Sequence, residues 1–134
     1  MARSRREPKW LTRLIVDAVH NEQIREHGGL AGIRDEAVLE AALARPLQKW
    51  RYQPNTDVPA LAAAYAFGLI KNHPYRDGNK RIGFLSMVTF LGLNGFDLTA
   101  TDADVVSEFV TLDAGSVSED ELRKWVNEHC RKRR

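Results

Sequence analysis

The chain has 134 residues, of which 43% are hydrophobic and 28% are charged, and these values are typical of one water-soluble domain with a sizeable core. Its single cysteine, Cys130, excludes an internal disulfide and favours a reducing compartment. The basic N-terminus lacks the apolar run of a signal peptide, and the segment LTRLIVDAVH that follows it is too short and too charged for a signal or a membrane span. We therefore expect a cytoplasmic protein.

The net charge of +2 hides an uneven distribution of charge along the chain. Seven of the 20 basic residues lie in two short tails, 1–7 and 131–134, and the body between them holds 13 basic and 17 acidic residues. We interpret 1–134 as a single domain with a mildly acidic body and solvated basic tails. Such a body is a poor footprint for nucleic acid, so we expect no direct nucleic-acid binding.

Two amphipathic helices are predicted in the first third of the chain. The first begins near Pro8 and ends at Gly28, with these buried positions: Leu11, Leu14, Ile15 and Ala18. The second is capped by Asp35 and stopped by Pro46, with these buried positions: Val38, Leu39, Ala42 and Leu43. No Cys or carboxylate lies at metal-ligand spacing from His20 or His27, so both are interpreted as surface or capping residues.

The next segment, LQKWRYQ at 47–53, has the alternation of a short strand or ribbon. Trp50 and Tyr52 share one face, and Lys49 and Arg51 share the other. The open edge of such a ribbon can bind an extended peptide through main-chain hydrogen bonds. A plain connector with one buried tryptophan is an equal alternative.

Two strongly apolar helices form the middle of the chain. The first, VPALAAAYAFGLIKN, follows the cap Asp57, and the second runs from about Asn79 to Leu93. Because both are apolar on nearly every side, we expect them to pack together at the centre of the fold.

A fifth helix opens at Thr101 or Asp102 and ends at Gly115, with these inward positions: Val105, Phe109 and Leu112. A sixth has a capping box of Ser118 and Glu121, with these inward positions: Leu122, Trp125 and Val126. The predicted class is all-α, with about six helices around a central hydrophobic pair and a small β-ribbon.

The stretch HPYRDGNKR, residues 73–81, joins the two apolar helices and is rich in turn residues. Gly78 and Asn79 precede a helix whose free N–H groups and dipole suit an anion, and Lys80 and Arg81 add positive charge. A carboxylate beside such a site, Asp77, indicates a divalent cation such as Mg²⁺.

Histidine is the side chain best suited to accept a proton near neutral pH, which makes His73 the candidate general base. Taken singly, these residues also fit a helix stop, an ordinary turn and a capping aspartate. Together, at this spacing, they favour a nucleotide or phosphate site.

The stretch resembles the Fic/Doc (Fido) signature H-x-F-x-[DE]-[GA]-N-[GK]-R, and in particular its Doc, or death-on-curing, branch. EHGGLAGIRDEAVLEAAL, at 26–43, also resembles this family, and the likeness covers most of 11–125. The resemblance implies a Fido fold with His73 as the general base and Asp77 as the Mg²⁺ ligand. It assigns nucleotide-phosphate binding to Gly78, Asn79, Lys80 and Arg81.

The resemblance implies structural and docking roles as well. Tyr75 stands where the signature has phenylalanine, as the anchor of the loop, and its hydroxyl needs a partner or water. In the family, a flap that positions the target chain corresponds to the 47–53 segment, which implies docking by Lys49, Trp50, Arg51 and Tyr52.

Two departures from the signature of AMP-transferring members bear on the reaction. Those members have glycine at the position of Lys80 and a second arginine at the position of Phe84. The Doc branch shares both changes, which implies transfer of the γ-phosphate of ATP to a Ser or Thr hydroxyl of a protein such as elongation factor Tu, inhibiting translation. Gly78, however, matches the AMP-transferring branch, so AMP transfer is the alternative. A catalytically degenerate Fido domain that acts as a binding module is a second alternative.

Self-inhibited Fic proteins carry a [ST]-x-x-x-E-[GN] helix, and this sequence contains no such string. The resemblance therefore implies the toxin of a type II toxin–antitoxin system. Its cognate antitoxin is expected to place an amphipathic helix in the nucleotide groove.

Overall fold

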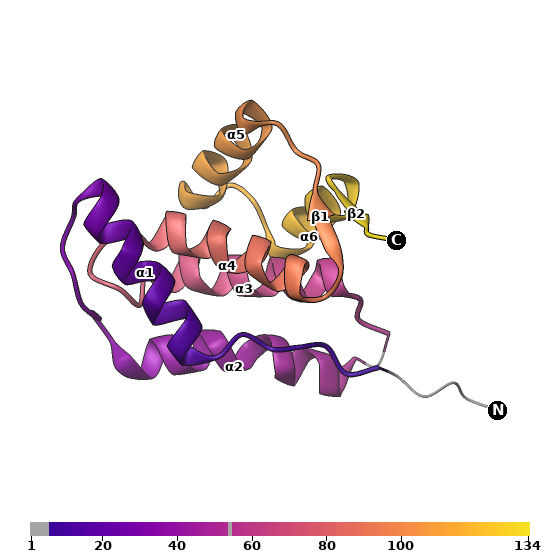
Figure 1. The fold of residues 1–134 in the computed structure, drawn as a ribbon, viewed down its shortest axis with the longest axis horizontal. Helices are drawn as coiled ribbons and strands as arrows, with labels where there is room; N and C mark the ends of the chain where they lie inside the picture. The colour runs from indigo at the N-terminus through magenta and orange to yellow at the C-terminus, as the bar shows by residue number, and fades with distance from the viewer. Residues whose placement is uncertain (1–5, 54) are drawn as a thin grey trace.

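A computed structural model describes residues 6–53 and 55–134. These residues form six α-helices and two short strands (Figure 1). In chain order the elements are α1 (Arg13–His27), α2 (Glu36–Tyr52), α3 (Val58–Asn72), α4 (Asn79–Leu93), β1 (Phe96–Leu98), α5 (Asp102–Asp113), α6 (Glu119–Glu128) and β2 (Cys130–Lys132). Within the described ranges, no helix combines the length and the apolarity that crossing a bilayer requires.

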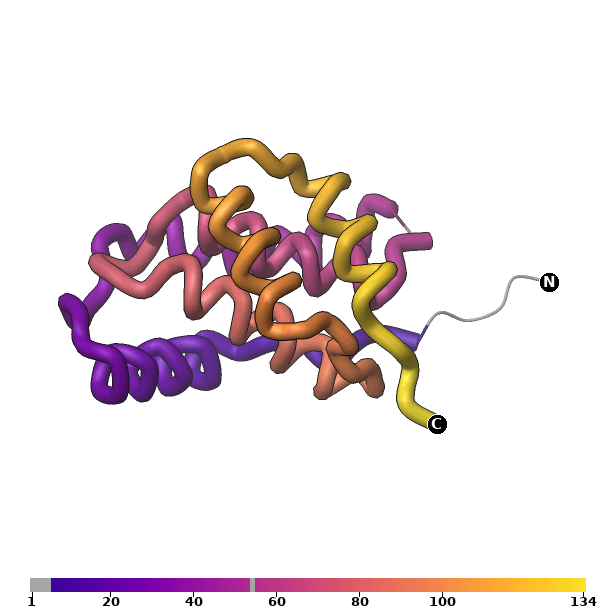
Figure 2. Tube along the Cα trace, turned by 90° about the horizontal axis from the view of Figure 1, so that it is seen from above, coloured from indigo at the N-terminus to yellow at the C-terminus, as the bar shows by residue number. Residues whose placement is uncertain are grey.

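The α3–α4 pair forms the centre of the fold, as the sequence predicts. From Pro59 to Ile70, every residue of α3 except Phe67 is buried. Helix α3 contacts α2, α4, α5 and α6, and Figure 1 shows α2 below and α5 above the central pair. Seen from above, α5 and α6 lie in front of this pair (Figure 2). The prediction of an all-α fold around two apolar helices is confirmed.

Most helices begin at a side-chain cap, which explains why their starts are readable in the sequence. The caps of α1, α2, α3, α5 and α6 each accept a backbone N–H from the first turn: Thr12, Asp35, Asp57, Thr101 and Ser118. The predicted capping box of Ser118 and Glu121 is present. Helix α4 is different, because it begins at Gly78 with no side-chain cap.

The predicted strand at 47–53 is wrong, because α2 continues through Pro46 to Tyr52. A proline inside a helix costs about 3 kcal/mol through its missing N–H and its ring. Burial of Pro46 and two tertiary contacts beyond it offset this cost. Trp50 packs edge-on against Trp10 with ring centroids 5.9 Å apart, and Lys49 forms an ion pair with Glu119 of α6 at 2.8 Å.

The small sheet of this fold lies elsewhere in the chain. Strand β1 pairs antiparallel with β2, so that Phe96 lies opposite Lys132 and Leu98 lies opposite Cys130. These strands flank α5 and α6 in sequence, and the pairing closes the C-terminal part of the fold back onto the end of α4.

The predicted inward face of the first helix is also wrong in part. Helix α1 begins at Arg13 rather than near Pro8. Leu14, Ile15 and Ala18 are exposed, whereas Leu11 is buried just before the helix. Its buried residues are Val16 and His20 instead. Arg13 pairs with Glu36 and Glu40 of α2, and this contact turns the Val16–His20 face toward the core.

Gly83 sets the distance between the two central helices. A Cβ added at this residue would lie 2.6 Å from Cγ1 of Ile70 and 3.2 Å from the carbonyl oxygen of Ala66. Gly68, on α3, has more room, because a Cβ there would meet Ala42 at 3.6 Å. The close approach of α3 and α4 therefore depends on the absence of a side chain at Gly83.

We predict that Gly83→Ala lowers the free energy of unfolding by about 1–3 kcal/mol, as overpacking of a core does. The matched variant Gly68→Ala should be neutral or stabilising by up to about 1 kcal/mol, because alanine is the better helix former. Urea unfolding followed by circular dichroism measures both. Equal stability of the two variants would contradict the assigned role of Gly83.

Candidate active site

Two residues at the ends of the loop between α3 and α4 have left-handed backbone conformations. His73, at the end of α3, has a φ of 47°, and Gly78, at the start of α4, has a φ of 75°. Glycine adopts this region readily, whereas a histidine there is under backbone strain unless its surroundings fix it. The prediction of a loop that ends at a conformationally special glycine is confirmed.

The side chain of Asn79 is hydrogen-bonded to the backbone in the middle of this loop. Its Oδ1 accepts the backbone N–H of Tyr75 at 3.0 Å, and its Nδ2 donates to the backbone carbonyl of Tyr75 at 3.0 Å. Asn79 is buried, so its amide is committed to the loop. If Asn79 contacts an anion, its backbone N–H is the group that does so.

Tyr75, the predicted anchor of the loop, lies in the core, and only 2% of its surface is exposed. Its hydroxyl donates to Oδ1 of Asp17 at 2.7 Å, and Asp17 forms an ion pair with Arg13 at 2.8 Å. Burial raises the pKa of Tyr75 well above its ordinary range, and the neighbouring Asp17 carboxylate raises it further. The partner that a buried tyrosine needs is therefore supplied by α1.

Arg34 braces the loop at the end of α3. Its Nε and Nη2 donate to the carbonyls of His73 and Asn72, two of the carbonyls that the end of a helix leaves without partners. The backbone N–H groups of Arg34 and Asp35 both donate to the carbonyl of Pro74. These contacts fix the backbone of His73 in its left-handed conformation.

The first turn of α4 has the properties of an anion site. Its N-terminus has no side-chain cap, in contrast to the other helices formed by the described residues. Free N–H groups and the positive end of the helix dipole therefore point at the space beside Gly78. Lys80 and Arg81 are exposed there, and both line the same cleft.

Asp77 lies at the edge of this candidate anion site. Its carboxylate accepts the N–H of Gly78 at 2.9 Å and the N–H of Leu30 at 3.3 Å. No group of three or more His, Cys, Asp or Glu side chains gathers as a metal site in the described part of the chain. A single exposed carboxylate fits Mg²⁺ when substrate phosphates and water complete the coordination, and Asp77 has lone pairs free for this.

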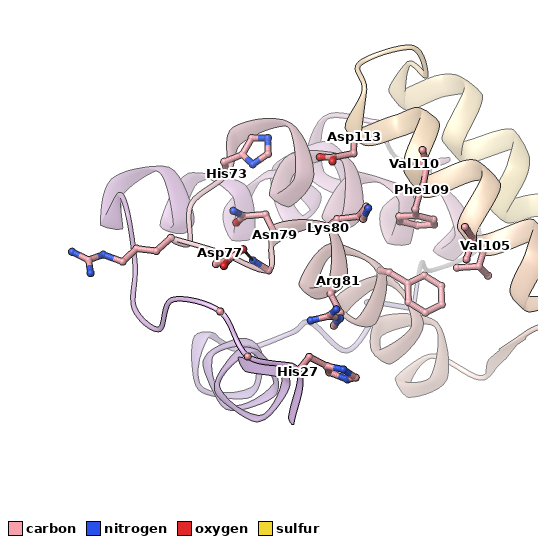
Figure 3. Close-up of a pocket in the computed structure, with 16 residues that line it drawn as sticks. His27, His73, Asp77, Asn79, Lys80, Arg81, Val105, Phe109, Val110 and Asp113 are labelled. Atoms are coloured by element: carbon pink, nitrogen blue, oxygen red, sulfur yellow. Dashed lines mark hydrogen bonds between the residues drawn. The ribbon is translucent and has the colours of Figure 1, made fainter. Parts of the chain in front are cut away.

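These residues face a cleft of about 700 Å³ (Figure 3). One end is polar and holds His73, Asp77, Gly78, Asn79, Lys80 and Arg81. The other end is an apolar wall from α4 and α5, formed by Phe84, Val105, Val106, Phe109 and Val110. Asp113 and His27 lie at opposite sides of the opening in Figure 3. A ligand with a charged end and a flat apolar end matches this arrangement.

Comparison with known proteins agrees with this geometry. The sequence model described as "Fic/DOC family" matches residues 10–91, which include the whole loop. The chain belongs to the Fic/DOC family.

Two curated relatives are named Doc. "Protein kinase doc" of Escherichia phage P1 is 33% identical over 78 residues, which cover 58% of this chain and 62% of that protein. "Toxin Doc" of Mycolicibacterium smegmatis (strain ATCC 700084 / mc(2)155) is 43% identical over 81 residues, covering 58% of this chain and 60% of that protein. The chain thus spans about three-fifths of the length of each relative, and the match supports the Fic/DOC fold and loop.

The predicted docking residues Lys49, Trp50, Arg51 and Tyr52 are not brought to this Fic/DOC cleft. None of them lines it, and they end α2 just before α3 begins, whereas His73 follows the end of α3. Helix α3 has 15 residues, a length of about 22 Å. Their role in docking a target stays a prediction, without the strand edge on which it rested.

The interpretation of His20 as a surface or capping residue is wrong. It is 1% exposed, and its Nε2 lies 2.8 Å from the carbonyl oxygen of Asp77. A signal for its burial was present, because Val16, His20 and Ile24 form a stripe at four-residue spacing. His27 is exposed, as predicted, but it also lines the cleft.

Tyr75→Phe, which restores the phenylalanine of the Fic/DOC signature, should change the pH-dependence of stability. A tyrosine whose pKa is higher in the fold than its unfolded value of about 10 contributes stability below pH 10 and loses it as the pH rises further. Between about pH 8 and about pH 11, the free energy of unfolding should therefore fall by about 1.4 kcal/mol less in the variant than in the native protein.

Urea unfolding at the two pH values measures this difference. Tyr52, whose surface is 87% exposed, provides the control, and Tyr52→Phe should leave the difference unchanged. An equal loss of stability in Tyr75→Phe and the native protein would show that the Tyr75 hydroxyl does not titrate in this way.

Proposed function

We propose that this protein transfers the γ-phosphate of ATP to a Ser or Thr hydroxyl of a target protein. The observation that carries the proposal is the uncapped N-terminus of α4 with Lys80 and Arg81, placed in one cleft with His73. This combination offers binding of phosphates and acceptance of a proton within one site. The apolar wall at the other end of the cleft suits a nucleobase.

Phe84 supports phosphate transfer over AMP transfer. Its ring lines the cleft and packs edge-on against Phe109, with centroids 5.2 Å apart. An apolar ring cannot clamp a terminal phosphate at this position, so the anionic end of ATP is best matched by Lys80, Arg81 and the helix N-terminus. In this orientation the γ-phosphate is the group that lies nearest the general base.

In the proposed reaction, the target hydroxyl attacks the γ-phosphorus and gives its proton to the imidazole of His73. A bond forms between the hydroxyl oxygen and the γ-phosphorus, the bond to the β–γ bridging oxygen breaks, and ADP leaves. The backbone N–H groups at the start of α4, with Lys80 and Arg81, stabilise negative charge on the transferred group. Asp77 would hold Mg²⁺, which neutralises phosphate charge when it is bound.

The names of the two relatives support a biological role. One is called a toxin and one a protein kinase, and we extend the role of a toxin of a type II toxin–antitoxin system to this chain. The target is expected to be a translation factor such as elongation factor Tu, in the cytoplasm. Val106 and Val110 are 62% and 52% exposed on α5 at the cleft, which suits the apolar face of an antitoxin helix.

The choice of transferred group is tested with ATP labelled at either the α- or the γ-phosphorus and incubated with this protein and a cell lysate. We predict that label enters protein from the γ position alone. Entry of label from the α position would replace the proposal with AMP transfer. No entry from either position, together with intact ATP binding, would favour a binding module without turnover.

The roles of the two central side chains are separable. His73→Ala should bind ATP with native affinity and lose about 10²- to 10⁴-fold in rate, because only proton acceptance is removed. Asp77→Ala should lose the dependence of ATP binding on Mg²⁺, measured by calorimetry with and without the metal. Asp113→Ala is the matched control, since Asp113 lies at the other side of the cleft and should retain that dependence. A loss of Mg²⁺-dependence in Asp113→Ala instead would reassign the metal ligand.

A further inference from the structure

His20 is a buried histidine beneath the loop that takes no part in the chemistry described above. Its Nε2 lies 2.8 Å from the backbone carbonyl oxygen of Asp77, 57 residues away in the chain. A carbonyl oxygen can only accept a hydrogen bond, so Nε2 carries the proton and donates it. The loop residue that faces the anion site is thus held from below by a side chain of α1.

The ring of His20 has little freedom to move away. It stacks on the ring of Tyr75, with centroids 3.7 Å apart and an angle of 13° between the planes. Tyr75 is itself fixed by its hydrogen bond to Asp17, on the same helix as His20. Stacking and donation together keep the Nε2–H aimed at Asp77.

This donation sets the orientation of the peptide between Asp77 and Gly78. In a trans peptide the C=O and the following N–H point in opposite directions. Because His20 binds the carbonyl of Asp77, the N–H of Gly78 faces away from α1. On that side it donates to the carboxylate of Asp77 at 2.9 Å. Gly78 lacks a Cβ that would otherwise restrict this peptide, so its orientation needs an external partner.

We propose that His20 is a positioning residue of the phosphate-binding turn: it fixes the Asp77–Gly78 peptide so that the start of α4 and the Asp77 carboxylate face the cleft. The inference rests on the proposed function, because it concerns binding of the same ATP phosphates. It assigns His20 no contact with ATP and no share in proton transfer.

Calorimetric titration with ATP and Mg²⁺ tests the proposal on three variants. His20→Phe keeps a ring to stack on Tyr75 but removes the donor, and we expect roughly tenfold weaker ATP binding, the size of effect that one hydrogen bond has. His20→Gln keeps an N–H donor at similar reach, and we expect it to restore most of the affinity. His129→Phe is the matched control, because His129 also stacks on an aromatic ring, Trp125, and bonds a backbone carbonyl, but outside the cleft.

A purely structural role of His20 gives a different result. In that case affinity would follow the melting temperature across the variants, and His20→Gln would bind no better than His20→Phe at equal stability. Native affinity in His20→Phe would also overturn the proposal. A native protein that fails to bind ATP would instead count against the proposed function.

A measurement on the native protein decides the point if His20→Phe does not fold. Long-range ¹H–¹⁵N spectra report which ring nitrogen of His20 carries the proton, and we expect an Nε2–H that exchanges slowly with water. Proton occupancy at Nδ1 alone would remove the hydrogen bond to Asp77 and with it the inference.

Discussion

The paired hydrogen bonds between Asn79 and the backbone of Tyr75 are the constraint on which the site depends. They join the first residue of α4 to the middle of the loop, in a buried position where either backbone group would be costly to leave unpaired. Because the bonds bring α4 back against the loop, the helix N-terminus and His73 open into the same cleft. The packing of α3 against α4 then fixes where that cleft lies.

Distant parts of the chain complete the support of this loop. Arg34 holds the carbonyls around His73, and His20 holds the carbonyl of Asp77. Helix α1 is in turn held to α2 by the ion pairs of Arg13. These contacts are polar, and most of the groups that make them have hydrogen-bond partners. Such a network specifies one arrangement of the loop more sharply than apolar packing does.

Local signals explain which parts of the structure the sequence predicts. Caps such as Asp57, the turn residues of 73–81 and the apolar central helices are each readable from a few neighbouring residues. Tertiary contacts determine the parts of the structure that the sequence does not predict. The helix through Pro46 persists because residues beyond it pack against Trp10 and α6, and the inward face of α1 follows from a pairing with α2. Nothing local to His20 indicates the carbonyl that it binds in the loop.

The loop contains side chains that hold it and side chains that it presents to the cleft. Tyr75 and Asn79 are buried and their polar side-chain atoms are hydrogen-bonded, whereas His73, Asp77, Lys80 and Arg81 are exposed and line the cleft. An exposed side chain without structural contacts changes stability by about 0.5 kcal/mol or less, so folding has little need of the imidazole of His73 or of the cations of Lys80 and Arg81. Binding a phosphate uses the cations but not a base at the opening. His73 also occupies a left-handed conformation that glycine would adopt with less strain. The imidazole is therefore the feature that a pure binding module leaves unexplained, and turnover, rather than affinity for the nucleotide, separates that alternative from an enzyme.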